Sequence, residues 1–229
     1  MKLAALFSGG KDSLFSVYLA KQLGHEIKCL ITIFPKSAES HLLHHPNVKW
    51  TRLQSESMKI PQITMTSESD ETNVEVKVLE DMLIRAKNDY GIEGIVHGGI
   101  KSKFQKNNFE TLCNKLNLQI ISPLWSFDSK QYLHDLISSK FIFIITSVSS
   151  EGLDDSWLGK QIGKNEIDTL LTLSEKFGFN LDFEGGEAET FVVNCPLFLN
   201  PIEIINEEKI WDGYRGRFEI LDARLKFNA

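Results

Sequence analysis

Short apolar runs alternate, over the first two thirds of the chain, with stretches in which apolar residues recur every three or four positions. The apolar runs are residues 2–7, 27–34, 94–98, 118–124 and 141–148. Continuous hydrophobicity is typical of parallel strands covered on both faces. The intervening stretches have helical spacing, which is clearest at Val76, Leu79, Leu83, Ala86 and Tyr90. This alternation predicts an α/β fold with a doubly wound, mostly parallel sheet.

The pattern changes after about residue 150. One more helical stretch covers residues 164–178, and alternating apolar and polar residues then follow at 188–194, 202–211 and 216–227. Alternation of this kind is typical of antiparallel strands with one covered face. We therefore predict two domains, residues 1–150 with the parallel sheet and residues 151–229 as a smaller α+β lobe.

Composition narrows the class of protein. The chain has 229 residues, 42% of them hydrophobic and 24% charged, as in ordinary globular proteins. Its net charge of −6 argues against a nucleic-acid backbone as the main partner, and no 18 apolar residues run together. Three widely spaced cysteines, Cys29, Cys113 and Cys195, fit a reducing compartment and are expected to be small buried side chains. These features predict a cytoplasmic protein without membrane spans.

A glycine-rich turn joins the first predicted strand to the first predicted helix. Its sequence, LFSGGKDSLF, covers residues 6–15 and lacks both the GxxxxGK[ST] and the GxGxxG spacings. Backbone amides at such a helix start favour phosphate, serine hydroxyls donate to it, and a lysine offsets its charge. An acid beside a phosphate indicates magnesium or a helix cap. The candidate residues are Ser8, Gly9, Gly10, Lys11, Asp12 and Ser13. The alternative is a tight turn before a capped helix.

A second glycine pair follows the strand predicted at 94–98. Gly98 and Gly99 stand where open α/β sheets bind ligands, beyond the carboxyl ends of strands. They are candidates for close approach of a ribose or an α-phosphate, with Ser102 and Gln105 as polar contacts. A plain loop and helix cap is the alternative.

The string SGGKDS resembles the signature of PP-loop ATP pyrophosphatases, SGGxDS after the first strand. Three later segments resemble the diphthine–ammonia ligase family in the same order. They are HGGIKSKFQKNNFE (97–110), GLDDSWLGKQI (152–162) and EGGEAETFVVNCPLF (184–198). The segment at 40–61 also resembles the family, and by this resemblance His44 contacts nucleotide or substrate. The resemblance spans essentially the whole chain.

The resemblance implies a ligase that uses ATP and magnesium to amidate diphthine on elongation factor 2 with ammonium. AMP and pyrophosphate would leave, the first domain would bind ATP and the second the substrate. The compact length resembles archaeal members. Within this family match, Glu184, Glu187 and Glu189 are candidates to attract ammonium and take its proton. Glu187 and Glu189 share a face if residues 187–193 form a strand. The alternative for the three acids is a solvated turn.

Other candidates and departures complete the sequence picture. Lys160 is a candidate phosphate or carboxylate contact, while Asp154 to Ser156 fit a helix cap equally well. Glu75 suits a helix dipole or the site. The departures from the family pattern are Ala188 for an aromatic residue, Phe183 for a common glycine, and Phe104, Lys106 and Asn108 for Tyr, Arg and Arg. The change at 188 bears more on how the substrate is bound than on which reaction is catalysed.

Two further functional classes compete with this assignment. One is another PP-loop reaction, such as tRNA thiolation, lysidine formation or amidation of a nucleotide, although basic surfaces and paired cysteines are not evident. The other is a regulator that binds ATP without turning it over, for which the acidic turn has no clear purpose. A zinc site at His41, His44 and His45 lacks the fourth ligand that a closed site requires.

Overall fold

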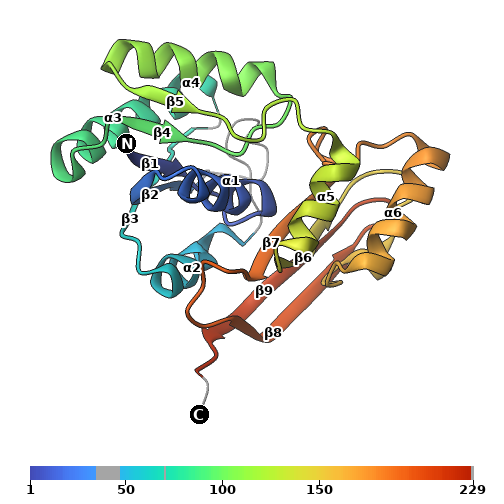
Figure 1. Cartoon of the computed structure of the whole chain (residues 1–229). Helices are drawn as coiled ribbons and strands as arrows, with labels where there is room; N and C mark the ends of the chain where they lie inside the picture. The colour runs from blue at the N-terminus through green and yellow to red at the C-terminus, as the bar shows by residue number, and fades with distance from the viewer. Residues whose placement is uncertain (35–46, 70, 228–229) are drawn as a thin grey trace.

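The computed structural model describes residues 1–34, 47–69 and 71–227, which form two sheets with helices around them (Figure 1). The strands of the first sheet are β1 (Lys2–Leu6), β2 (Glu26–Phe34), β3 (Gln62–Thr66), β4 (Gly94–Val96) and β5 (Gln119–Ile121). Those of the second are β6 (Ile142–Val148), β7 (Ala188–Asn194), β8 (Ile202–Trp211) and β9 (Gly216–Leu225). The helices are α1 (Lys11–Gln22), α2 (Thr51–Met58), α3 (Thr72–Tyr90), α4 (Lys103–Leu116), α5 (Ser129–Ser138) and α6 (Lys164–Phe177).

The first sheet is entirely parallel, in the order β3-β2-β1-β4-β5. Successive side chains of a strand point to opposite faces. Leu3, Ala5 and Leu30 accordingly belong to the core that includes α1, while Ala4 and Cys29 belong to the core that includes α3 and α4. Helices on both faces of a parallel sheet confirm the predicted doubly wound α/β fold.

The chain order reverses at β1, because β2 and β3 lie on one side of it and β4 and β5 on the other. Neighbouring parallel strands whose connections run in opposite directions leave a crevice beyond their carboxyl ends. The glycine-rich turn leaves β1 and the glycine pair leaves β4 at this point. The fold therefore brings together two loops that are almost ninety positions apart in the sequence.

The second sheet is antiparallel, in the order β7-β6-β9-β8. Its strands at the C-terminal end and the helix α6 confirm the predicted smaller α+β unit. The run at 141–148 is a correction, since we predicted it in the parallel sheet and it pairs antiparallel with β7 and β9. Its position inside the second sheet explains its continuous hydrophobicity. The division at residue 150 stays a prediction, although the strands change sheet between β5 and β6.

Helix α1 is packed between the two sheets (Figure 1). Its buried apolar residues belong to one continuous core with both β1 and the second sheet. The three cysteines are free and buried, as predicted, and burial raises the pKa of the Cys29 and Cys195 thiols to about 12. Within the described residues, no helix is long and apolar enough to cross a membrane.

Candidate active site

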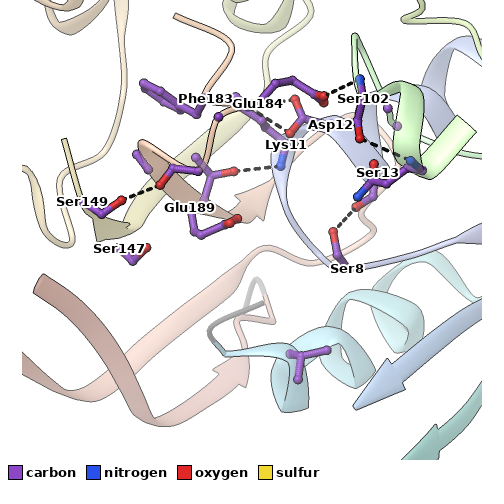
Figure 2. Close-up of a pocket in the computed structure, with 18 of the residues that line it drawn as sticks. Ser8, Lys11, Asp12, Ser13, Ser102, Ser147, Ser149, Phe183, Glu184 and Glu189 are labelled. Atoms are coloured by element: carbon purple, nitrogen blue, oxygen red, sulfur yellow. Dashed lines mark hydrogen bonds and ion pairs between the residues drawn. The ribbon is translucent and has the colours of Figure 1, made fainter. Parts of the chain in front are cut away.

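A cavity of about 1150 Å³ opens at the reversal point between the two sheets. Its walls come from the loops after β1 and β4 on one side and from β7, the turn before β7 and the β8–β9 turn on the other. Ten of the candidate residues predicted from the sequence line it (Figure 2). These are Ser8, Lys11, Asp12, Ser13, Gly98, Gly99, Ser102, Gln105, Glu184 and Glu189.

The glycine-rich turn is held from outside by residues that the sequence analysis missed. Gln54 of α2 is fully buried and donates from Nε2 to the carbonyl oxygens of Gly9 (2.9 Å) and Val192 (2.8 Å). Gly9 has φ +84°, and a β-carbon there would lie 2.6 Å from Gln54 Oε1. The Lys11 amide donates to Thr190 Oγ1 of β7 at 3.1 Å. Both sheets therefore shape this turn, and glycine is required at position 9.

The two serine hydroxyls of the turn lie against each other. Ser8 Oγ donates to Ser13 Oγ at 3.2 Å, and Ser13 Oγ donates to the Gly10 carbonyl at 3.0 Å. Gly10 precedes the first helical residue, and no side chain caps α1 there. Asp12 is therefore not the cap of this helix. The turn instead presents a helix start and two hydroxyls to the cavity, an arrangement that suits an anion.

Lys11 is 1% exposed despite its charge. Its Nζ donates to Asp12 Oδ1 (2.8 Å), Asp12 Oδ2 (3.0 Å) and the Asp182 carbonyl (2.7 Å). It also lies 5.6 Å from the Tyr132 ring centroid and 5.2 Å from that of Phe183, within cation–π range. The ammonium is thus paired inside the protein, which is what a buried lysine requires.

Asp182 is a buried acid that our sequence analysis missed. Its Oδ2 accepts from Lys101 Nζ (2.7 Å) and Ser129 Oγ (2.5 Å), and its Oδ1 accepts from the Glu184 amide (3.2 Å). Burial alone would raise its pKa, but these hydrogen bonds and the Lys101 charge outweigh burial, so its pKa is lowered. Asp182 therefore stays ionised and anchors the turn before β7.

Glu184 joins this turn to the loop after β4. Its Oε1 accepts from the Ile100 amide (3.0 Å), and its Oε2 accepts from the amides of Lys101 (3.3 Å) and Ser102 (3.2 Å). Burial and then the Asp12 charge raise its pKa, although the backbone hydrogen bonds oppose them. Both oxygens are therefore occupied by backbone donors, and the carboxylate closes the contact between the two walls.

Glu187 and Glu189 occupy different environments. Glu187 Oε1 accepts from Asn180 N (3.0 Å) and Nδ2 (2.6 Å), and its Oε2 accepts from the Gly185 amide (2.9 Å), so this carboxylate ties the turn together. It does not line the cavity, whereas Glu189, in strand β7, does (Figure 2). The expected strand begins at Ala188, one residue after Glu187.

The glycine pair after β4 is needed for packing as well as for access. A β-carbon at Gly98 would lie 2.5 Å from the Asp12 carbonyl carbon, so this loop rests directly on the start of α1.

The Gly99 amide donates to His97 Nδ1 at 3.1 Å, and His97 Nε2 lies 2.7 Å from Ser122 Oγ. Burial, and then the Lys106 charge, lower the pKa of His97 to about 4, which keeps this ring neutral. Ser102 caps α4, as the alternative interpretation predicted, and it also lines the cavity, so its contact with a ligand stays a prediction.

Phe183 explains one departure from the family pattern. Its φ is +65°, in the left-handed region that favours glycine, where a bulky residue costs on the order of 1 kcal/mol or more. The ring is buried beside Lys11 Nζ and lines the cavity. The packing of this ring offsets the strained backbone. Ala188 also lines the cavity and is buried, so a larger side chain at 188 would alter this wall.

The remaining candidates lie elsewhere. Lys160 is exposed, with Nζ 4.8 Å from the Trp157 ring centroid, and it does not line the cavity. Asp154 caps the short 3₁₀ helix Asp155–Trp157, as one of the two interpretations predicted. Glu75 is fully buried, whereas an interaction with the helix dipole alone would not require burial.

The predicted contact His44 and the possible zinc ligands His41 and His45 fall outside the described residues. Within those residues, no group of three or more His, Cys, Asp or Glu could hold a metal ion.

The fold and the SGGKDS turn at its reversal point place the chain in the PP-loop class of α/β proteins. Residues 1–120 match the family model described as diphthamide synthase N-terminal domain, and residues 128–225 match the one described as diphthamide synthase C-terminal domain. The chain belongs to the diphthine–ammonia ligase family, as the motifs predicted.

Curated relatives agree with this assignment. A diphthine–ammonia ligase of Rattus norvegicus is 34% identical over 92% of this chain and 85% of the relative, and that of Homo sapiens is 33% identical over the same shares. The Saccharomyces cerevisiae enzyme of that name is 26% identical over 99% of this chain and 37% of its own length. A solved structure described as a predicted tRNA methyltransferase subunit from Methanocaldococcus jannaschii covers 86% of this chain and 98% of its own, with TM-score 0.44 and 22% identity. That likeness is too distant to support an argument.

Proposed function

We propose that the protein amidates diphthine on elongation factor 2 with ammonium, using ATP and releasing AMP and pyrophosphate. The observation that carries this proposal is the single cavity that both the SGGKDS turn and Glu189 line. A nucleotide held by the turn and a carboxyl substrate held near β7 would meet inside it. Membership of the diphthine–ammonia ligase family supports this choice of substrate.

The chemistry explains why ATP is needed. A carboxylate reacts poorly with ammonia because oxide would have to leave, whereas an acyl-adenylate offers AMP as the leaving group. Attack of the substrate carboxylate oxygen on the α-phosphorus forms the new P–O bond and breaks the bond to pyrophosphate. Ammonia then attacks the acyl carbon, the bond to AMP breaks, and one proton must leave nitrogen. Amides of the SGGKDS turn, with Lys11, would stabilise charge on the phosphates.

Magnesium is part of this proposal. The acids at the turn are Asp12 and Glu184, and burial followed by the nearby Asp12 charge raises the pKa of Glu184. Magnesium in such sites takes one or two carboxylates together with substrate phosphates, so this small acid set fits an ion that arrives with ATP. Asp12 would hold the ion, which would supply charge neutralisation at the phosphates.

Glu189 is the acid we propose for the proton of ammonium. Of the three glutamates around the Gly-Gly turn, Glu187 does not line the cavity, and Glu184 lines it where its two walls meet. Glu189 lines the cavity from β7. A carboxylate there would attract ammonium and accept its proton as the acyl carbon is attacked.

The test combines the protein, ATP, magnesium, ammonium and elongation factor 2 that carries diphthine. We expect AMP to form only with all five components, and the modified histidine to lose about one mass unit as hydroxyl is replaced by amino. AMP formation that does not depend on the modified factor would refute the substrate. Release of ADP and orthophosphate would refute the adenylation mechanism.

A further inference from the structure

We propose that Tyr132 is a positioning residue that fixes the Asp12 carboxylate for the adenylation step. This inference rests on the proposed function, because it assigns a role in the turnover of ATP. Tyr132 lies on α5, about 120 positions from the turn that it contacts.

The Tyr132 hydroxyl has one well-defined partner. The side chain is fully buried, and its hydroxyl donates to Asp12 Oδ1 at 2.5 Å. Hydrogen bonds from a hydroxyl to a carboxylate are short and about twice as strong as neutral ones. An ionised carboxylate can only accept hydrogen bonds, so the Tyr132 hydroxyl is the donor of this pair.

The surrounding packing does not require this hydroxyl. The Tyr132 ring lies 5.7 Å from Phe15, which itself packs edge-on against Phe141. A phenylalanine would fill the same place in this aromatic cluster, and a buried hydroxyl costs free energy unless it is hydrogen-bonded. The hydroxyl is therefore explained by its acceptor, Asp12, rather than by packing.

The hydrogen bonds distinguish the two oxygens of Asp12. Within the described residues, Oδ1 accepts from both Tyr132 and Lys11 Nζ, whereas Oδ2 accepts from Lys11 Nζ alone. The carboxylate is thus held in one orientation with Oδ2 less engaged. That oxygen is the one we assign to the magnesium ion that would arrive with ATP.

Helix α5 positions a second acid of the site in the same way. Ser129 stands three residues before Tyr132, on the same side of the helix, and donates to Asp182 Oδ2 at 2.5 Å. Asp182 in turn accepts Lys11 Nζ at its carbonyl. One face of α5 therefore orients both acids that surround the Lys11 ammonium.

The test compares Tyr132→Phe with Tyr18→Phe in the AMP assay with diphthine-bearing elongation factor 2. Tyr18 is a matched control because its ring also packs on Phe15 and Phe141, at 5.8 and 5.7 Å. We expect Tyr132→Phe to lower kcat by about 10- to 100-fold, as for loss of one hydrogen bond to a charged group. The KM for ATP should change by less than about 3-fold, and Tyr18→Phe should behave as wild type.

The outcomes separate this inference from the proposed function. Wild-type protein that forms no AMP would overturn the proposed function, and this inference with it. Normal wild-type turnover with kcat of Tyr132→Phe within about 2-fold would overturn the positioning role alone. A rise in KM at unchanged kcat would also overturn it. If Tyr132→Phe does not fold, 3-fluorotyrosine at position 132 takes its place. Its ¹⁹F signal should move when magnesium and ATP are added, and an unchanged signal would overturn the role.

Discussion

At the scale of single residues, the three glutamates around the Gly-Gly turn have different environments and should respond differently to substitution. We predict that Glu189→Gln lowers amide formation by about 100-fold or more, because it removes the acid that takes the ammonium proton. ATP affinity should stay near that of wild type. Amide formation is followed by the mass of elongation factor 2, and ATP affinity by calorimetry.

Glu187→Gln is the matched control for this prediction. Its carboxylate binds Asn180 and the Gly185 amide instead of lining the cavity. The substitution places an amide donor against backbone donors, and we expect it to lower the free energy of unfolding by about 1 to 2 kcal/mol. Amide formation and ATP binding should then decline together. A selective loss of amide formation in Glu187→Gln, with Glu189→Gln near normal, would exchange the two roles.

Residues that touch the site through long-range contacts could not be predicted from the sequence. The turn at 8–13 is recognisable from its consecutive glycines, lysine and acid, and the structure places Lys11 and Asp12 in the cavity wall. Tyr132 and Gln54 stand on helices with ordinary amphipathic patterns, and only the fold aims them at the turn. Asp182 had one local signal, because it lies two residues before Glu184 in the same acidic turn.

At the scale of elements, helix α2 holds the glycine-rich turn against strand β7 through Gln54. We predict that Gln54→Ala lowers the free energy of unfolding by about 2 to 4 kcal/mol, because it removes two buried hydrogen bonds and leaves a cavity. The KM for ATP should rise several-fold, since the Gly9 carbonyl keeps only the Val192 amide as a donor and the turn is less constrained. Chemical denaturation and initial rates of AMP formation measure the two effects.

Ser57→Ala on the same helix provides the control. Ser57 is one turn further along and donates to the Asn200 carbonyl at 2.6 Å, away from the turn. Its loss should reduce stability by about 1 kcal/mol and leave the KM for ATP unchanged. An equal rise in KM for both variants would mean that α2 acts on the site through general stability instead of through Gln54.

The elements themselves were largely predictable, and the two failures have physical causes. The apolar run at 141–148 belongs to a strand between two antiparallel neighbours, and such a run does not reveal which sheet it joins. Strand β3 was missed because it is short, lies at the sheet edge and buries only Ile63 fully. Helices α3 and α6 were predicted well because each has apolar residues at helical spacing and ends before a glycine, Gly91 or Gly178.

At the scale of the whole molecule, the site depends on two sheets that meet around α1. Two acids between the sheets have pKa values shifted in opposite directions, since the pKa of Glu184 is raised while that of Asp182 is lowered. Glu184 contributes stability that is present below its unfolded pKa and lost as pH rises. Asp182 contributes stability that is present above its unfolded pKa and lost as pH falls. The contributions of Glu184 and Asp182 to stability change with pH in opposite directions. The contact between the two sheets therefore has no single direction of pH dependence.

His97 gives the molecule a clear acid sensitivity. It is 2% exposed, and burial followed by the Lys106 charge lowers its pKa from 6.5 to about 4. Between these values the unfolded chain binds a proton that the folded chain does not, so the stability from His97 is complete above pH 6.5 and is lost as pH falls toward 4. The gap corresponds to about 3 kcal/mol. The free energy of unfolding, measured by denaturant at several pH values, should decline over this window in wild type and much less in His97→Gln. His134→Gln on α5 should keep the wild-type slope, and parallel curves for wild type and His97→Gln would show that His97 does not control this sensitivity.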